Sequence, residues 1–270
     1  MIIINQEKCI GCGSCSRDCF PGAIEQENKK AVLKNPANCI SCGHCIALCP
    51  VEAISAPDLD MASIHNDFPE KDPEGLLKKM QARRSCRHYT WEKVSEGDLA
   101  LLLEAARACP TAKNLQATRY IAVTEKIDAI LDAALDGLGK VGEIQLKTAT
   151  APDERRRAEN FLRWAETRKE DKSFDPLFFH APLLLIFVAE KENCNDACAA
   201  AAYTELMAAE LGLGCLYSGY FTACAAGSPE IRALLGLDDK EAVCRCLVLG
   251  HKDIRFLRTA PRKPYRLERM

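Results

Sequence analysis

The sequence predicts two unequal domains: a small cysteine-rich domain over residues 1–56 and a larger domain of mixed helices and strands over residues 76–270. Three observations support this division. The length of 270 residues suits two domains better than one. Eight of the 16 cysteines fall within the first 49 residues. Residues 57–75 are rich in Pro and Asp and show no sustained periodicity, which is typical of a linker.

Composition and charge disfavour several classes of partner. The formal net charge is -2, from 36 basic and 38 acidic side chains, so no overall field would attract nucleic acid or an anionic membrane. No apolar run approaches the roughly 20 residues needed to span a bilayer. The first residues, MIIINQEKC, lack the basic and apolar regions of a signal peptide. Cysteines at metal-ligand spacing also favour a reducing compartment, and we expect a cytoplasmic protein.

The cysteines of the small domain form a repeat. Cys9 recurs at Cys39, and the same offset of 30 residues relates the other three cysteines to their counterparts. Both copies have the spacing C-x2-C-x2-C-x3-C, which lets three thiolates converge on an iron-sulfur cubane while the fourth points elsewhere. A pair of zinc sites is the alternative, although tetrahedral zinc normally uses two separated cysteine pairs. The eight predicted metal ligands are Cys9, Cys12, Cys15, Cys19, Cys39, Cys42, Cys45 and Cys49.

Over about residues 1–56 the sequence resembles the bacterial two-cluster ferredoxin family. In that family the fourth cysteine of each repeat binds the cluster of the other repeat. The resemblance implies one 4Fe-4S cluster on Cys9, Cys12, Cys15 and Cys49, and a second on Cys39, Cys42, Cys45 and Cys19. One departure is Phe20, which follows Cys19 where the second repeat has Pro50. His44 lies in the loop of the second cluster and is expected to tune its surroundings.

The larger domain shows helical and strand patterns in alternation. Apolar residues at helical spacing begin at Leu76 and again at Gly97, and a third helix is expected over 126–138. Strands are expected over 120–125, 182–190 and 242–250, the last two as apolar runs buried on both faces. An Ala-rich helix, apolar all round, is expected over 196–214, as in a core or a dimer interface.

Residues 153–172 predict a charged helix with few apolar residues, among them Phe161 and Trp164. Two interpretations remain open. The helix either presents a solvated face or forms a mobile lid over a substrate pocket.

Four polar segments of this domain could bind a phosphorylated ring compound. RRSCRHY at 83–89 places two arginines and a serine at alternate positions, where they suit a phosphate or ring carbonyls, although a solvated basic turn is the alternative for the segment alone. ACPTAKNLQATRY at 108–120 offers amide side chains, and PRKP at 261–264 a rigid cationic segment. GLGCLYSGYF at 212–221 has small residues beside which a planar ring could lie.

In this order and at this spacing, the four segments resemble the FMN-dependent nitroreductase family over roughly residues 76–270. The resemblance implies an α+β fold, a central sheet flanked by helices, and an intertwined homodimer with FMN at the subunit interface. It implies that one subunit contributes Arg83, Ser85, Arg87 and Arg262, and the other contributes Pro110, Thr111 and Asn114. Ser218 and Gly219 would present a backbone amide toward flavin N5. Departures at Ala112, Ala117 and Thr118 concern the wall of the pocket on the partner side.

The remaining cysteines and histidines give no further pattern. Cys86 lies inside the predicted phosphate segment, where it is either a reactive thiol or, as we expect, a packing residue. The other seven are expected in the core, with a third metal site as the alternative: Cys109, Cys194, Cys198, Cys215, Cys224, Cys244 and Cys246. The five histidines form no triad pattern, and no residue is predicted as an obligatory acid or base.

The two resemblances together imply an oxidoreductase. Each cubane carries one electron and FMN carries one or two, so the pair could convert single-electron flow into reduction of a nitroaromatic, a quinone or an activated alkene. Reduced ferredoxin or NAD(P)H is the expected donor, with NAD(P)H binding over the flavin because no separate dinucleotide motif is present. One alternative is an electron-transfer module whose partner is another redox protein. A redox sensor is a further alternative, against which the lack of a DNA-binding pattern counts.

Overall fold

The chain forms two units, and the computed structural model describes all residues, 1–270. The cysteine-rich unit contains Met1–Lys71 together with Thr111–Gln116. The sheet unit contains Asp72–Pro110 and Ala117–Met270. The short segment Thr111–Gln116 therefore packs with the cysteine-rich unit, although the residues on both sides of it belong to the sheet unit.

The cysteine-rich unit is built from short elements around a small apolar core. Strands β1 and β4 pair antiparallel, and so do β2 and β3, which form a hairpin. Asn28 and Lys29 have positive φ values between β2 and β3, as a tight hairpin turn requires. The elements are β1 (Ile3–Ile4), α1 (Ser14–Asp18), β2 (Ile24–Glu27), β3 (Lys30–Leu33), η1 (Pro36–Asn38), α2 (His44–Ala47), β4 (Ile54–Ser55), η2 (Met61–Ser63) and η3 (Ala112–Asn114).

The sheet unit has one four-stranded antiparallel sheet, in the order β5-β6-β8-β7. The mixture of helices with this sheet is the predicted α+β class. Its elements are α3 (Pro73–Ala82), α4 (Glu96–Arg107), β5 (Arg119–Val123), α5 (Ile127–Thr148), α6 (Pro152–Glu170), β6 (Leu183–Glu190), η4 (Lys191–Asn193), α7 (Cys194–Glu210), β7 (Leu213–Tyr217), α8 (Gly219–Ala225), α9 (Pro229–Leu235) and β8 (Glu241–His251).

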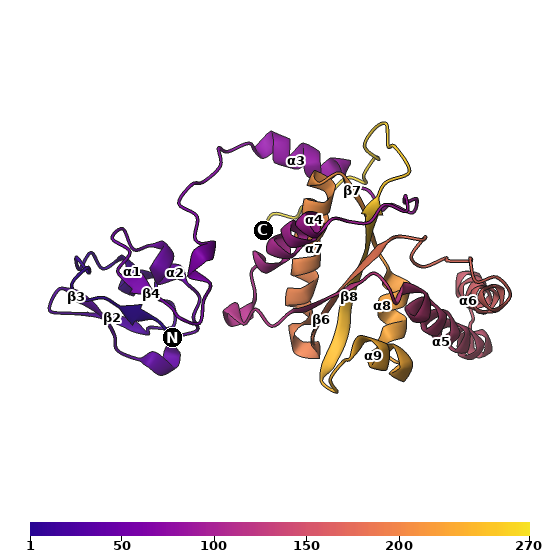
Figure 1. Ribbon diagram of the computed structural model, residues 1–270, viewed down its shortest axis with the longest axis horizontal. Coiled ribbons are helices and arrows are strands. Elements are labelled where there is room, and N and C mark those ends of the chain that lie inside the picture. Colours follow the sequence, from indigo (N-terminus) through magenta and orange to yellow (C-terminus); the bar gives the residue numbers. More distant parts are fainter. The chain divides into compact units, whose positions relative to one another are not determined.

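Helices cover both faces of this sheet (Figure 1). Side chains alternate between the faces of a strand, so successive residues of β6 enter different cores. Leu185 and Phe187 pack with α4 and α7 on one face. Leu184 and Ile186 pack with α5, α8 and α9 on the other. Burial on both faces explains why the 182–190 segment is an uninterrupted apolar run.

Helix α6, predicted as a charged surface helix, is anchored to α5. Arg168 is only 4% exposed. Its Nε lies 2.6 Å from Asp132 Oδ1 and its Nη2 lies 2.8 Å from Asp128 Oδ1, and both carboxylates belong to α5. Phe161 is buried in the same core as α5. One face of α6 is therefore fixed, and whether the helix moves as a lid stays a prediction.

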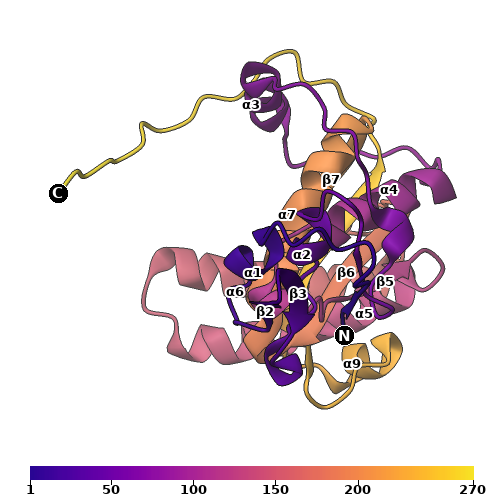
Figure 2. The same ribbon diagram turned by 90° about the vertical axis from the view of Figure 1, so that its left-hand side faces the viewer.

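Two features of the sheet unit differ from the expected pattern. The helix expected over 126–138 continues to Thr148. The helix expected over 196–214 ends at Glu210, and residues 213–217 form the strand β7. Beyond β8 the chain runs out as a tail without helix or strand, shown in yellow in Figure 2. No helix in the protein has both the length and the apolar character needed to span a membrane.

Candidate functional site

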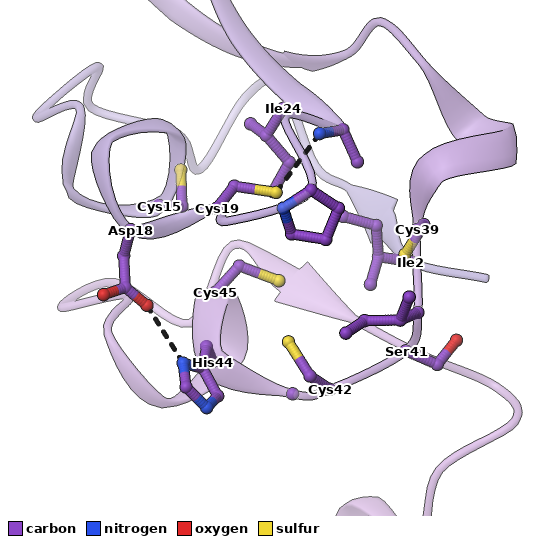
Figure 3. Close-up of a pocket in the computed structure, with 14 residues that line it drawn as sticks. Ile2, Cys15, Asp18, Cys19, Ile24, Cys39, Ser41, Cys42, His44 and Cys45 are labelled. Atoms are coloured by element: carbon purple, nitrogen blue, oxygen red, sulfur yellow. Dashed lines mark hydrogen bonds and ion pairs between the residues drawn. The ribbon is translucent and has the colours of Figure 1, made fainter. Parts of the chain in front are cut away.

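The eight cysteines of the repeat surround two hollows in the cysteine-rich unit. Cys9, Cys12, Cys15 and Cys49 line one of them, hereafter hollow 1. Cys19, Cys39, Cys42 and Cys45 line the other, hollow 2, which Cys15 also borders. Figure 3 shows the sulfurs of Cys19, Cys39, Cys42 and Cys45 directed into hollow 2, while that of Cys15 points away from it. These are the two groups of four named above, and the ligation itself stays a prediction.

Backbone amides support the sulfurs in the same way in both repeats. The Ala23 N–H donates to Cys19 Sγ at 3.3 Å, and the Ala53 N–H donates to Cys49 Sγ at 3.2 Å. Ala23 and Ala53 are related by the same offset as the cysteines. Amide hydrogen bonds to ligand sulfurs raise the reduction potential of a cluster by stabilising its more negative form. The same amide–sulfur hydrogen bond thus occurs at equivalent positions of both repeats.

The chemistry of the sulfurs fits an iron-sulfur cluster. Burial raises the pKa of the Cys45 thiol to about 11, so a bound iron would have to displace its proton. Hydrogen bonds from Ser14 lower the pKa of Cys12, which favours its thiolate. No three Cys, His, Asp or Glu side chains are close enough together to hold a single metal ion. The sulfurs are instead spread around hollows, as a larger group requires.

One polar pair borders hollow 2. His44 Nδ1 lies 3.1 Å from Asp18 Oδ2, and both side chains are exposed. Each of the two repeats contributes one member of the pair. The contact therefore joins the repeats beside the four sulfurs of hollow 2, as the dashed line in Figure 3 shows.

A cavity of about 580 Å³ lies in the sheet unit where β7 ends and α8 begins. This volume falls in the range of about 300–1,000 Å³ that is usual for small-molecule sites. Arg87 is its one charged side chain, and four of its ten lining residues are aromatic. The lining residues are Arg87, Trp164, Pro176, Leu177, Phe179, Leu216, Tyr217, Ser218, Gly219 and Tyr220.

Three of the predicted flavin residues meet in this cavity: Arg87, Ser218 and Gly219. The two backbone amides differ, because the Ser218 N–H donates to the Cys246 carbonyl at 3.0 Å. Gly219 is the first residue of α8, so its N–H lies outside the helix's own hydrogen-bond ladder. Of the two residues, Gly219 therefore has the amide available to a ligand.

Aromatic residues of the cavity were not predicted as site residues. Trp164 on α6 and Tyr220 on α8 pack edge to face with ring centroids 5.8 Å apart. Burial raises the pKa of the Tyr217 phenol, so its hydroxyl stays protonated and can donate. The apolar residues within the charged stretch 153–172 were a signal for Trp164, because they had to contact something on one side.

The structure does not bring Arg83 together with Arg87. Arg83 is ion-paired with Glu205 of α7, whose side chain is 9% exposed. Arg83 and its neighbour Arg84 border a separate hollow of about 160 Å³. Ser85 is exposed and bridges to Cys215 beside β7. Arg83 and Arg87 therefore border different hollows, although both lie at alternate positions of the 83–89 segment.

The other predicted flavin residues are spread over both units. Pro110 is exposed in the sheet unit, and Arg262 is exposed in the C-terminal tail. Thr111 and Asn114 belong to the segment that packs with the cysteine-rich unit. The Asn114 Nδ2 group donates to the Ser41 carbonyl at 2.9 Å, next to the predicted ligand Cys42.

Among the cysteines outside the repeat, the structure shows one pairing that was not predicted. Cys194 and Cys244 form a disulfide that joins α7 to β8. Cys86 is fully buried, as expected of a packing residue. Four others are buried in the cores: Cys109, Cys215, Cys224 and Cys246. Cys198 is half-buried on α7.

Solved structures of similar fold are nitroreductases. The crystal structure of a nitroreductase with bound FMN from Bacteroides fragilis superposes with a TM-score of 0.54 at 22% identity, covering 72% of this chain and 98% of that one. A nitroreductase with bound FMN from Desulfitobacterium hafniense gives 0.52 at 23% identity, with coverage of 72% and 98%. An FMN-dependent nitroreductase from Clostridium difficile gives 0.54 at 19% identity, with coverage of 74% and 100%. At these identities the likeness concerns the fold.

Family models match both parts of the sequence. A comparison with curated proteins found no match. The model of the 4Fe-4S dicluster domain matches residues 1–50. The model of the nitroreductase family matches residues 80–251, which is more than half of the chain. The chain therefore belongs to the nitroreductase family and carries a 4Fe-4S dicluster domain at its N-terminus.

Proposed function

We propose that this oxidoreductase is an iron-sulfur flavoprotein that passes electrons between two 4Fe-4S clusters and FMN and reduces a small nitroaromatic, quinone or activated alkene. One observation carries the proposal: a single chain holds two hollows with four sulfurs each and a cavity where Arg87 and the Gly219 amide meet aromatic walls. The FMN-bound nitroreductases of similar fold support the choice of flavin.

Hollow 1 would hold one cluster on Cys9, Cys12, Cys15 and Cys49. Hollow 2 would hold the other on Cys39, Cys42, Cys45 and Cys19. A bound cluster would take the place of the thiol protons, and the Ala23 and Ala53 amides would stabilise the charge on the sulfurs. Two clusters store two electrons, which is the number that reduction of an organic acceptor consumes.

The cavity of the sheet unit would hold FMN. Arg87 would supply a positive charge for the phosphate or for the ring carbonyls, and Gly219 would offer its N–H to the ring. We extend the site to Ser85, and to Arg262 in the tail. A second copy of the chain would complete it with Pro110, Thr111 and Asn114, so the working assembly is a homodimer. The role of Arg83 at the phosphate lacks support, because its guanidinium pairs with Glu205.

FMN supplies the hydride chemistry when it is bound. The chain's own groups set the conditions for that chemistry. The Gly219 N–H would donate a hydrogen bond to the ring and so tune its potential, and the protonated Tyr217 hydroxyl lines the same cavity. Trp164, Phe179 and Tyr220 exclude water and offer flat surfaces against which a planar acceptor can stack.

The cavity favours an enzyme over a pure electron-transfer module. A module whose flavin never meets an organic substrate has no need of an aromatic cavity open to solvent. Tyr220 at the cavity is 46% exposed, so the site is accessible from outside. Electrons would come from reduced ferredoxin or NAD(P)H.

Chemical analysis tests the proposal first. Anaerobically purified protein should contain iron, sulfide and FMN, with two clusters for each flavin. The reduced protein should then be mixed with nitrofurazone, menadione or 2-cyclohexenone, which represent the three acceptor classes. Turnover of at least one is expected. Protein that binds neither iron nor flavin, or that reduces none of the three, contradicts the proposal.

A matched pair of variants at Gly219 tests the flavin site. Gly219→Pro removes the N–H, and proline is tolerated at the first position of a helix. Gly219→Ala keeps the N–H, and no heavy atom lies within 4 Å of the added Cβ. Loss of one hydrogen bond should weaken FMN binding about tenfold in Gly219→Pro, as measured by fluorescence titration of the apoprotein. Equal affinities in the two variants would remove Gly219 from the site.

A further inference from the structure

The segment Thr111–Gln116 contacts the loop of one cluster hollow, within the cysteine-rich unit. It follows Pro110 and precedes Ala117, which both belong to the sheet unit, yet it packs with the cysteine-rich unit. Within that unit, Asn114 Nδ2 donates to the Ser41 carbonyl at 2.9 Å. Ser41 immediately precedes Cys42 and lines hollow 2. The contact is thus made to the backbone of a ligand loop.

Ser41, whose carbonyl accepts this hydrogen bond, has an unusual backbone conformation. Its φ is 48°, in the left-handed region that side chains other than glycine rarely adopt. The matching position of the first repeat is Gly11, with φ 71°. A strained residue persists where its surroundings hold it. Ser41 is held twice, because its Oγ donates to Asp58 Oδ2 at 2.8 Å and its carbonyl accepts from Asn114.

The segment is itself held in one shape. Lys113, Asn114 and Gln116 all have φ values near 50°. The Gln116 N–H donates to the Thr111 hydroxyl at 3.2 Å, and the Asn114 N–H donates to the Thr111 carbonyl at 3.1 Å. The side chain of Asn114 is therefore presented on a stiff turn. The cluster loop that Asn114 contacts is the loop of hollow 2, because Ser41 borders that hollow.

We propose that Asn114 is a positioning residue for electron transfer, and that the cluster of hollow 2 is the one that exchanges electrons directly with FMN. The cluster of hollow 1 then receives electrons from the external donor. This assignment rests on the proposed function above. A one-electron donor such as reduced ferredoxin reduces the hollow 1 cluster, which is reoxidised as it reduces the hollow 2 cluster. Two such electrons and one proton convert FMN to its hydroquinone anion, and the hollow 2 cluster returns to its oxidised state after each transfer.

Matched ligand variants test the order of the clusters. Cys12 and Cys42 occupy equivalent positions of the two repeats, and each is replaced by Ala. The variant with both substitutions gives the rate at which the donor reduces the flavin without the clusters. Full-length protein loaded with iron, sulfide and FMN is mixed with reduced methyl viologen in a stopped-flow instrument. Flavin reduction should fall to the double-variant rate in Cys42→Ala and stay about tenfold or more above it in Cys12→Ala. Loss in both, or in Cys12→Ala alone, overturns the order.

Variants at Asn114 test the positioning role. In protein reloaded with FMN to full content, Asn114→Ala should slow flavin reduction about tenfold with unchanged iron content, and should alter the electron paramagnetic resonance spectrum of the hollow 2 cluster only. Asn114→Asp removes the donor and places a carboxylate against the Ser41 carbonyl, so the slowing should be as large. Lys113→Ala, on the same turn, is the control and should behave as wild type.

Two outcomes separate the failure of this inference from the failure of the proposed function. Wild-type rates and spectra in Asn114→Ala, measured in protein with full iron and FMN content, overturn the positioning role alone. Protein that contains no FMN or no iron overturns the proposed function, and the inference with it.

Discussion

The two cysteine repeats share their spacing but reach the same backbone shape by different means. In the first repeat, glycines occupy two left-handed positions, Gly11 with φ 71° and Gly22 with φ 67°. The second repeat has Ser41 and Glu52 at the equivalent positions, with φ 48° and 50°. The first repeat needs glycine at position 11, because an added Cβ would lie 1.8 Å from the Lys29 carbonyl oxygen. The second repeat has side chains at these positions, and one of them, Ser41, donates a hydrogen bond to Asp58.

The repeats therefore differ in how their ligand loops are held. Glycine serves where the backbone must pack closely, and a strained serine serves where the loop is bonded to Asp58 and Asn114.

Removal of the fourth cysteine of a repeat, which is predicted to bind the cluster of the other repeat, should give the largest effect. Cys19→Ala should lose the cluster of hollow 2, because Cys19 lines that hollow with the three cysteines of the other repeat. About half of the iron should be lost. The thiols freed for alkylation, mapped by mass spectrometry, should be those at positions 39, 42 and 45. Cys49→Ala is the matched control and should free positions 9, 12 and 15. The opposite labelling pattern would show that each repeat holds its own cluster.

Substitutions at the first left-handed position, residue 11 or residue 41, should give the next largest difference in stability between the repeats. Gly11→Ala combines a left-handed alanine with a clash against the Lys29 carbonyl oxygen, and should destabilise the cysteine-rich unit by about 3 kcal/mol. Ser41→Gly relieves strain but loses the hydroxyl bond to Asp58, so its net effect should be within about 1 kcal/mol. Thermal unfolding followed by cluster absorbance measures both. Equal destabilisation in the two variants would contradict the assigned difference in packing.

The second left-handed position should give the smallest effect. An added Cβ at Gly22 meets no atom within 4 Å, so Gly22→Ala should cost only the left-handed strain, about 1 kcal/mol after the gain in chain stiffness. Glu52→Gly removes the same strain and should stabilise by about 0.5 kcal/mol. Shifts of the melting temperature in opposite directions are expected. Shifts of the same sign would mean that contacts of the Glu52 side chain outweigh its backbone strain.

The cysteine-rich unit was the part most open to prediction from the sequence. Eight thiols at a fixed offset constrain the loops around them, and the family model confirms the dicluster domain. In the sheet unit, strands near 182–190 and 242–250 could be predicted because burial on both faces leaves a long apolar run. Strand β7 was missed because it is short, contains Gly214 and directly follows the apolar helix α7.

Features that depend on contacts distant in the sequence could not be predicted. Arg83 and Arg87 lie four residues apart, but Glu205 of α7 draws one of them into a different hollow. Cys194 and Cys244 are separated by 50 residues, and spacing alone does not determine such a pairing. The burial of Arg168 on a helix full of charges depends on the two aspartates of α5. The packing of Thr111–Gln116 with the cysteine-rich unit belongs to the same class.

Because Trp164 lines the cavity, its fluorescence should report whether a flavin occupies that cavity. The chain has two tryptophans, and Trp91 is 82% exposed while Trp164 lines the aromatic cavity. An isoalloxazine in that cavity would quench the emission of Trp164. Loading of the flavin could therefore be followed by emission from the unlabelled protein, with Trp91→Phe removing the background signal.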